Sequence, residues 1–267
     1  MSHVKACSLE MKANQKAFAE KVDITTLWPE HSRIRAVEET ESTNSDMRLL
    51  ADQGLPEGFW LLANKQTKGR GRQGRKWQLP EGNLAISGLV RIRKTDTSLS
   101  GLAFVAALAL YQAASLFVKA DWLSLKWPND LMLKGAKCAG ILIEGHQDAM
   151  IFGFGVNLKQ AVKLDRPTAA LADFADKIPE KKAFSEALVA SFADWLDIWR
   201  KQGIEIIHDN WLKRAHNIHT PLTIHKENGE LLSGYFAGLD PDGALKLRLQ
   251  NDRICLFHSG DVLLARS

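Results

Sequence analysis

Hydrophobic and polar residues alternate along this chain with two different periods, which predict two kinds of element. Short apolar runs bounded by glycine, asparagine or aspartate are typical of strands, and apolar residues at helical spacing are typical of amphipathic helices. Strands are predicted over 34–37, 59–63, 83–91, 123–126, 131–133, 140–144 and 150–156. Helices are predicted over 12–22, 46–53, 99–119 and 182–202. Strands with only a few long helices indicate an α+β or α/β fold.

The pattern changes after Thr220. Five short strands are predicted over 221–226, 230–238, 244–250, 253–257 and 262–265. Asn228-Gly229 between the first two is a strong hairpin signal. Strands this short and this close together predict a small β-barrel. We therefore expect an N-terminal extension (1–31), a main domain (32–217) and a small C-terminal domain (218–267).

Charge is concentrated at one place in the chain. The 267 residues are 45% hydrophobic and 25% charged, with a net charge of +4, which is ordinary for a globular protein. Six lysines and arginines, and no acidic residue, fall between Lys65 and Trp77. This local excess is larger than the net charge of the whole chain. A single anion site explains it better than a broad nucleic-acid-binding surface.

Several classes of protein do not fit the composition. The three cysteines form no CxxC pair, which argues against a disulfide framework or a zinc site. No signal peptide is evident, and no apolar run approaches the roughly 20 residues that span a bilayer. We therefore expect a cytoplasmic protein that does not enter a membrane.

The basic run contains Gly69-Arg70-Gly71-Arg72-Gln73-Gly74, which matches G-x-G-x-x-G. A dinucleotide-binding motif would need a helix directly after the last glycine, but here a strand follows. A P-loop would need Lys-Ser/Thr where Arg75-Lys76 stands. Glycines let the backbone fold around a small ligand, and arginines pair bidentately with phosphate oxygens. The loop therefore predicts a lid over nucleotide phosphates, mobile without its ligand, and an enzyme that uses ATP.

A second polar cluster is Lys126-Trp127-Pro128-Asn129-Asp130, a turn between two predicted strands. It displays a cation, an amide and a carboxylate together. Lys137 follows, just before the apolar strand 140–144. A lysine at the mouth of an apolar pocket is costly unless an anion pairs with it. The turn alone could be an ordinary surface feature, but Lys137 strengthens the prediction of a site.

These motifs together resemble those of biotin–protein ligases. The resemblance covers roughly residues 33–267, and its motifs stand in the family's order and spacing. They are Glu41–Asn44, Gln66 with Gly69–Trp77, Lys126–Asp130, Lys137–Glu144 and Gly153–Asn157. It implies an α+β fold, with a class II synthetase-like catalytic domain of mixed sheet and flanking helices. The barrel after residue 218 is similar to the family's SH3-like C-terminal domain.

The resemblance also implies a two-step reaction. Biotin's carboxylate attacks the α-phosphate of MgATP, which gives biotinyl-5′-AMP and pyrophosphate. A specific lysine of a biotin carboxyl carrier protein of acetyl-CoA carboxylase then attacks the adenylate and becomes biotinylated. Mg²⁺ would come with ATP and not from a site made by the protein alone. Catalysis of this kind depends mostly on positioning and on cations.

The similarity assigns roles residue by residue. Those implied to bind biotin are Ser42, Thr43, Asn44, Gln66, Gly69, Arg70, Arg72, Lys137, Gly140, Leu142 and Gly153. Those implied to bind ATP or the adenylate are Arg72, Arg75, Trp77, Asn129, Lys137, Gly155 and Asn157. Those implied to take part in catalysis are Lys137, Arg72, Lys126 and Asp130. Asp130 could orient the acceptor lysine or act as its base, and the sequence does not decide between the two.

Two features depart from the wider family. Many members carry an N-terminal winged helix-turn-helix that binds DNA, and the extension 1–31 is too short for one, so we expect no repressor function. Cys138 stands where an aliphatic residue is common and is either a small buried residue or an oxidation-sensitive thiol. A homodimer is compatible with the resemblance. The alternatives are a lipoate–protein ligase and a nucleic-acid-binding regulator that uses the basic loop.

Overall fold

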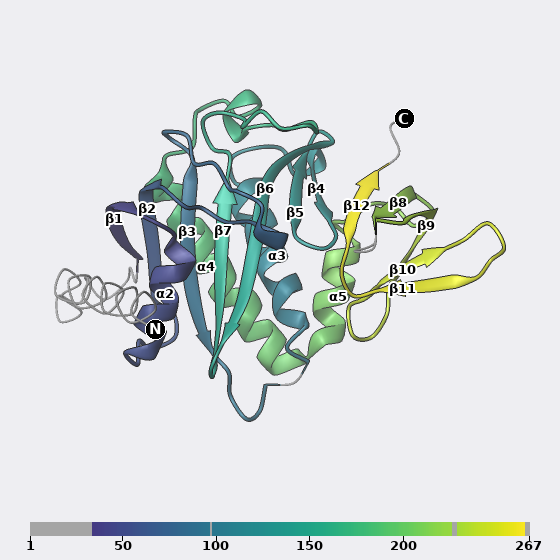
Figure 1. Cartoon of the computed structure of the whole chain (residues 1–267), viewed down its shortest axis with the longest axis horizontal. Helices are drawn as coiled ribbons and strands as arrows, with labels where there is room; N and C mark the ends of the chain where they lie inside the picture. Colours follow the sequence, from purple (N-terminus) through teal and green to yellow (C-terminus); the bar gives the residue numbers. More distant parts are fainter. Residues whose placement is uncertain (1–33, 97, 226–228, 265–267) are drawn as a thin grey trace, which may run out of the picture.

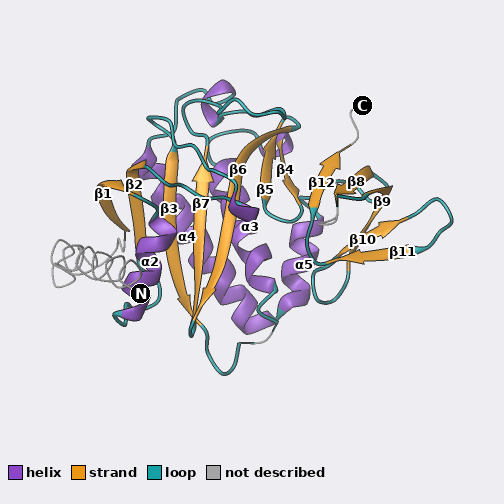
Figure 2. Ribbon diagram, viewed as in Figure 1, coloured by secondary structure: helices purple, strands orange, loops and turns teal. Residues whose placement is uncertain are grey.

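The structure, a computed structural model, describes residues 34–96, 98–225 and 229–264, so the predicted helix over 12–22 lies outside the described residues. A mixed seven-stranded sheet with helices on both faces forms the larger part of the molecule, and a five-stranded antiparallel sheet lies beside it (Figures 1 and 2). This confirms the predicted α+β fold class and the β-rich C-terminal region.

The larger sheet has the strand order β1-β2-β3-β7-β6-β5-β4. Only β1 and β2 are parallel to each other among these neighbours, and every other pair is antiparallel. The strands are β1 (Ile34–Thr40), β2 (Trp60–Gln66), β3 (Leu84–Arg91), β4 (Leu123–Lys126), β5 (Asp130–Leu133), β6 (Ala136–His146) and β7 (Ala149–Val156). Each overlaps a predicted strand, and β6 is much longer than the pattern predicted.

Helices cover the two faces of this sheet unequally. Figure 1 shows α2 (Thr43–Asp52) on one face, with α3 (Gly101–Ser115), α4 (Lys181–Gln202) and α5 (Ile204–Leu212) on the other. The sequence did not predict α5. The alanine- and leucine-rich helix α3 is buried on most sides. None of the helices in the described part is long and apolar enough to cross a membrane.

Strand alternation divides the apolar residues between two cores. In β7, Phe152 and Phe154 belong to the main core under α3–α5, whereas Ile151 packs with Met47 and Leu50 of α2 on the opposite face. Successive side chains of a strand point to opposite faces, so β2, β3 and β7 supply both cores. Beyond the end of α2, the second face is left without a helical cover.

The smaller sheet has the order β11-β10-β9-β8-β12. Its strands are β8 (Pro221–His225), β9 (Leu231–Leu239), β10 (Leu245–Arg248), β11 (Ile254–Phe257) and β12 (Asp261–Leu264). Its buried residues, such as Phe236 and Leu247, belong to the same core cluster as Phe104 and Trp211 of the larger part. Trp127 Nε1 also donates to the carbonyl oxygen of Gly243 at 3.3 Å. The two parts are therefore packed directly against each other.

The start of α2 differs from the prediction. The helix begins at Thr43, not at residue 46, and its N-cap Ser42 makes no side-chain cap hydrogen bond. The backbone N–H of Thr43 donates instead to Gln66 Oε1 at 2.8 Å. Thr43 and Asn44 thus lie within the first turn of the helix, where their side chains are buried.

Candidate active site

Small residues form a row across the face of the larger sheet that α2 covers only in part. Residues paired directly between antiparallel strands point to the same face. Asp130 pairs with Gly140, Gly140 with Gly155, and Gly155 with Ala85. In the next row, Gly153 lies between Ser87 and Leu142. Glycine and alanine at these positions leave a hollow where larger side chains would fill the face.

The hollow is a cavity of about 1110 Å³. Ligand pockets of drug-like size measure roughly 300–1,000 Å³, so this cavity has room for a large ligand or for two ligands. It is lined by both sheets and by the basic loop. The lining residues include Ser42, Thr43, Asn44, Gln66, Arg70, Arg72, Arg75, Trp77, Lys126, Asn129, Asp130, Lys137, Gly140, Leu142, Gly153, Gly155, Arg166, His225, Val262 and Leu263.

One end of the cavity is polar and formed by neutral side chains. Gln66 Oε1 accepts hydrogen bonds from the backbone N–H of Thr43 and from its Oγ1, at 2.8 and 3.1 Å. Ser87 Oγ lies 2.6 Å from both Thr43 Oγ1 and Asn44 Oδ1. Asn44 Nδ2 donates to Glu144 Oε2 at 2.8 Å. These bonds hold hydroxyl and amide groups of three elements at fixed positions for a polar, uncharged ligand group.

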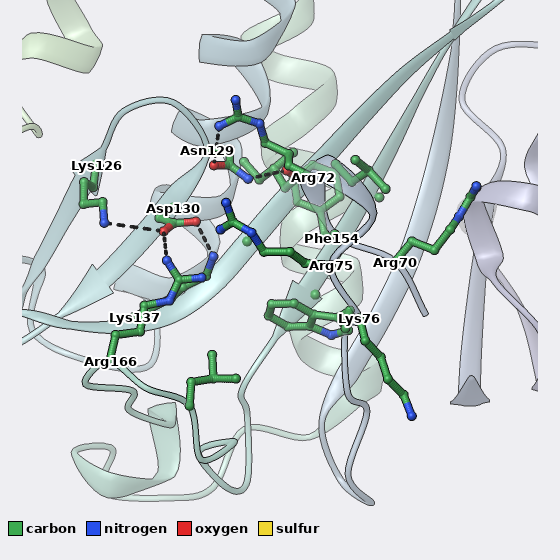
Figure 3. Close-up of a pocket in the computed structure, with 18 of the residues that line it drawn as sticks. Arg70, Arg72, Arg75, Lys76, Lys126, Asn129, Asp130, Lys137, Phe154 and Arg166 are labelled. Atoms are coloured by element: carbon green, nitrogen blue, oxygen red, sulfur yellow. Dashed lines mark hydrogen bonds and ion pairs between the residues drawn. The ribbon is translucent and has the colours of Figure 1, made fainter. Parts of the chain in front are cut away.

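The other end of the cavity is cationic. The carboxylate of Asp130 is 6% exposed and forms an ion pair with Lys137 through Oδ1. Its Oδ2 lies 3.8 Å from Lys126 Nζ and 3.9 Å from Arg166 Nη1. Burial lowers the pKa of Lys137, and Asp130 opposes this by raising it. Figure 3 shows this cluster on the side of the pocket away from Arg70.

The basic loop closes over the cavity as a tight hairpin. Its arms are joined by hydrogen bonds from Gly71 N to Arg75 O (2.7 Å) and from Trp77 N to Gly69 O (2.9 Å). At its tip, Arg72 Nη1 donates to Asn129 Oδ1 at 3.3 Å, and Asn129 Nδ2 donates to the Ile141 carbonyl at 2.8 Å. The loop therefore contacts the β4–β5 turn.

A second contact of the loop is with β6 and α2. Arg70 Nη2 lies 3.4 Å from Glu144 Oε2 and donates to Ser45 Oγ at 3.2 Å. Because Glu144 also accepts from Asn44, this contact joins the loop to the neutral end of the cavity. The two arginines thus attach the loop to opposite sides of the hollow.

Trp77 lies against the row of glycines. A Cβ built on Gly155 would lie 2.2 Å from the Trp77 ring, and one on Gly140 would lie 3.4 Å from it. Lys137 Nζ is 5.9 Å from the ring centroid, within the range of a cation–π contact. The indole ring therefore fits against β6 and β7 because these strands carry glycine at Gly140 and Gly155. It provides a flat apolar wall beside the cationic end.

Comparison with known proteins agrees with this arrangement. Residues 36–160 match the model of the biotin/lipoate A/B protein ligase family. A biotin--[acetyl-CoA-carboxylase] ligase of Paracoccus denitrificans is 36% identical over 221 residues, which are 78% of this chain and 91% of that protein. The chain belongs to the biotin–protein ligase family.

Other members of the family are also similar to this chain. The ligase of Mycobacterium tuberculosis is 29% identical over 88% of this chain and 90% of its own length. The bifunctional ligase/repressor BirA of Escherichia coli is 28% identical over 79% of this chain and 67% of its own length. A biotin protein ligase of Aquifex aeolicus, solved with biotin and ATP, superposes with a TM-score of 0.75 at 25% identity, over 88% of this chain and 99% of that one.

Most residues that the resemblance to biotin–protein ligases singled out line this cavity. Two lie outside that lining. Gly69 is at the base of the hairpin, where a Cβ would lie 2.5 Å from the carbonyl oxygen of Trp77. Asn157 is buried, donates to the Ala169 carbonyl at 3.1 Å and lines a small hollow next to Trp77 and Lys137. Their binding roles stay predictions.

The structure adds site residues to which the sequence motifs assigned no role. Ser87 and Glu144 hold the neutral end, and Arg166 belongs to the cationic cluster. Val262 and His225 reach the cavity from the smaller sheet. The alternation of β3 could have indicated Ser87, as a polar residue within an apolar strand. The sequence around Arg166 carries no comparable signal.

Cys138 is fully buried in the main core. Burial raises the pKa of its thiol to about 12, so the thiol stays protonated at neutral pH. The thiolate is the form of cysteine that reacts. Of the two expectations for this residue, the small buried apolar residue fits the structure.

Proposed function

We propose that this protein uses ATP to convert biotin to biotinyl-5′-AMP, and then transfers biotin to a lysine of the biotin carboxyl carrier protein of acetyl-CoA carboxylase. The proposal is supported by relatives named biotin--[acetyl-CoA-carboxylase] ligase, one of them 36% identical over most of both chains. It is also supported by the similar Aquifex aeolicus structure that contains biotin and ATP. These similarities favour biotin over lipoate as the substrate, and an enzyme over a nucleic-acid-binding regulator.

The observation that carries the proposal is the two-ended cavity. Seven cationic side chains and two carboxylates line it, and six of the cations come from the basic loop or the β4–β6 region. This excess of positive charge matches a ligand pair that contains a triphosphate and a carboxylate. The neutral end, by contrast, presents hydroxyl and amide groups that match a ureido group.

We assign the residues to the ligands accordingly. Thr43, Asn44 and Gln66 would bind the ureido ring of biotin, with Ser42 beside them. Residues along the middle of the cavity would enclose the rest of biotin, namely Arg70, Gly140, Leu142 and Gly153, and Gly69 would support them from the base of the basic loop. Residues near Trp77 would bind ATP or the adenylate, namely Arg72, Arg75, Trp77, Asn129, Gly155 and Asn157. Mg²⁺ would arrive bound to the phosphates of ATP.

In the first step, an oxygen of biotin's carboxylate would bond to the α-phosphorus, and the bond from that phosphorus to the bridging oxygen of pyrophosphate would break. Lys137 lies at the cationic end beside Trp77 and would contact both the carboxylate and the α-phosphate. Its ammonium would reduce the repulsion between the two anions and stabilise the charge that builds up around phosphorus. Arg72 would add a second cation once the loop is closed.

In the second step, the acceptor lysine's amine would attack the acyl carbon and displace AMP. The amine must lose its proton, so a base or a hydrogen-bond acceptor is needed nearby. Asp130 is the cavity's buried carboxylate. We propose that it orients the incoming lysine and accepts its proton.

Two finer proposals concern partners. The Paracoccus denitrificans relative, which is 36% identical, is named a ligase alone. We propose that this protein is likewise a ligase without a repressor function, which a gel-shift assay with biotin operator DNA would test. A homodimer is compatible with the proposal, and sedimentation with and without biotinyl-AMP would test it.

The function itself is tested by ATP–pyrophosphate exchange. We expect exchange of labelled pyrophosphate into ATP that depends on biotin and does not occur with lipoate. Biotinyl-AMP should be recovered after the reaction is quenched. Exchange that requires lipoate instead would reject the assignment to biotin, and no exchange with either acid would reject adenylation.

A further inference from the structure

The segment of residues 162–169 follows β7 and lies along β6 at the cationic end of the cavity. Lys137 N donates to the Pro167 carbonyl at 2.9 Å, and Ala169 N donates to the Lys137 carbonyl at 3.0 Å. Thr168 Oγ1 donates to the Val162 carbonyl at 2.7 Å and closes the base of the segment. These bonds fix the backbone on both sides of Arg166 directly beside Lys137.

The guanidinium of Arg166 lies near Asp130 but makes no close hydrogen bond with its carboxylate. Its Nη1 lies 3.9 Å from Asp130 Oδ2, well beyond the roughly 2.7–2.9 Å of a charge-assisted hydrogen bond. Its Nε is buried and has no hydrogen-bond partner among the described residues. The side chain is 32% exposed and lines the cavity. An arginine carries five N–H donors, so most of its binding capacity is available to a ligand.

Three cationic side chains form ion pairs with the single carboxylate of Asp130. One carboxylate faces Lys137, Lys126 and Arg166, and the two lysines are nearly as buried as the carboxylate itself. The pKa of Lys137 is lowered, chiefly by burial, and Arg166 adds to this by repulsion. Buried excess charge is costly unless an ion of opposite sign compensates it. The cluster therefore suits a ligand that carries more than one negative charge.

We infer that Arg166, together with Lys126, binds the β- and γ-phosphates of ATP and stabilises the pyrophosphate that leaves in the first step. The inference rests on the proposed function. Lys137 is assigned to the α-phosphate, and Figure 3 shows Lys126, Lys137 and Arg166 around Asp130, on the side of the pocket away from Arg70. The remaining phosphates would extend into this end, because biotin's ureido ring would occupy the other.

The chemistry gives Arg166 a role in the transition state. As the carboxylate oxygen bonds to the α-phosphorus, the bond to the bridging oxygen breaks and its electron pair passes to pyrophosphate. The negative charge on that leaving group therefore grows. Cations fixed before the reaction stabilise such charge without reorganising, and arginine can pair with two phosphate oxygens at once. Once pyrophosphate has left, the adenylate has no group for Arg166 to bind.

This difference between the two half-reactions provides the test. Arg166→Gln and Arg166→Lys would be compared with the wild-type protein in biotin-dependent ATP–pyrophosphate exchange. Each protein would then be given isolated biotinyl-AMP and a carrier domain, which measures transfer alone. The KM for pyrophosphate would be measured in the reverse reaction. Lys163→Gln is the matched control, because this exposed lysine belongs to the same segment but does not line the cavity.

We expect Arg166→Gln to slow adenylation by about 100-fold and to raise the KM for pyrophosphate, while transfer from biotinyl-AMP stays within about twofold of wild type. Arg166→Lys should be intermediate, because it keeps the charge but loses the bidentate geometry. Lys163→Gln should behave as wild type. If Arg166→Gln does not fold, the result for Arg166→Lys decides.

Equal losses in both half-reactions would overturn the inference, because they would mean that Arg166 only supports Asp130 and Lys137. Unchanged adenylation would also overturn it. A loss of transfer alone would point to the carrier domain as the partner of Arg166 and would again overturn it. Failure of the proposed function looks different, because the wild-type protein would then form no biotinyl-AMP.

Discussion

At the scale of single residues, Asp130 is the centre of the site. It accepts ion pairs from three cations and is one of two carboxylates that line the cavity. The other is Asp165, which is exposed. A carboxylate in this position both holds the cations in place for the first step and lies within the site for the second.

Asp130→Asn should slow transfer from isolated biotinyl-AMP by about 100-fold, the typical effect of losing a general base. Asp165→Asn is the control and should leave transfer unchanged. A variant at Asp130 that transfers biotin at the wild-type rate would remove Asp130 from this role.

Sequence motifs predicted most of these residues but not all. Lys126, Asp130 and Lys137 stand in recognisable local patterns, and the structure brings them together. Arg166 could not be predicted, because it reaches the cluster through a non-local pairing between its segment and β6. The role of Glu144 was hidden for a similar reason: its partners Asn44 and Arg70 are far away in the sequence.

At the scale of elements, the basic loop packs against β6 and β7 through Trp77 and the glycines of these two strands. The loop was expected to be a lid, and its arginines contact both sides of the cavity through Asn129 and Glu144. Whether it is mobile without ligand stays a prediction. The predicted start of α2 was too late because its first residues are polar. In the structure, Thr43 lies within the helix and donates a hydrogen bond to Gln66.

Arg72→Gly should let biotinyl-AMP leave the site before transfer, because the loop loses its contact with the β4–β5 turn and a cation near the phosphate. We expect the dissociation rate of biotinyl-AMP to rise by at least about tenfold, with non-specific labelling of added proteins. Lys68→Gln, an exposed change next to the loop, is the control. A variant at Arg72 that retains the adenylate as long as wild type would contradict the lid.

Gly155→Ala should displace the Trp77 ring, since the new Cβ would lie 2.2 Å from it. We expect the KM for ATP to rise by at least about tenfold, because a base stacked on an aromatic side chain gains about 1–3 kcal/mol. Biotin binding, measured by calorimetry without ATP, should change little. Gly145→Ala on β6 is the matched control, because its nearest neighbour would be Met150 Sδ at 3.7 Å. Equal ATP kinetics in the two variants would contradict this role of Trp77.

At the scale of the whole molecule, the two sheets share one hydrophobic core. The sequence predicted a separate small domain from residue 218, and its five strands are present. Composition and turn signals could not show how it packs, because the contacts of Phe236 and Leu247 with the larger part are long-range. Since Val262 and His225 also line the cavity, this packing affects the site as well as stability.

Gly243→Ala tests the junction between the two parts. Gly243 has a φ of +85°, and a Cβ there would lie 2.5 Å from the Phe104 ring. Gly229 has a similar φ of +82° with no neighbour within 4 Å, so Gly229→Ala is a matched control for backbone strain alone. We expect a cost of about 1–2 kcal/mol in the free energy of unfolding for the control and at least about 1 kcal/mol more for Gly243→Ala. Equal costs would show that the junction tolerates the added side chain.

The central claim is that the cavity joins biotin to a carrier through an adenylate, and the most direct test is mass spectrometry of the carrier. The protein would be incubated with biotin, MgATP and the biotin carboxyl carrier domain, beside a carrier whose acceptor lysine is replaced by arginine. We expect one biotin amide on the acceptor lysine, none on the arginine variant, and none when lipoate replaces biotin. A carrier that stays unmodified with biotin, or that is lipoylated instead, would contradict it.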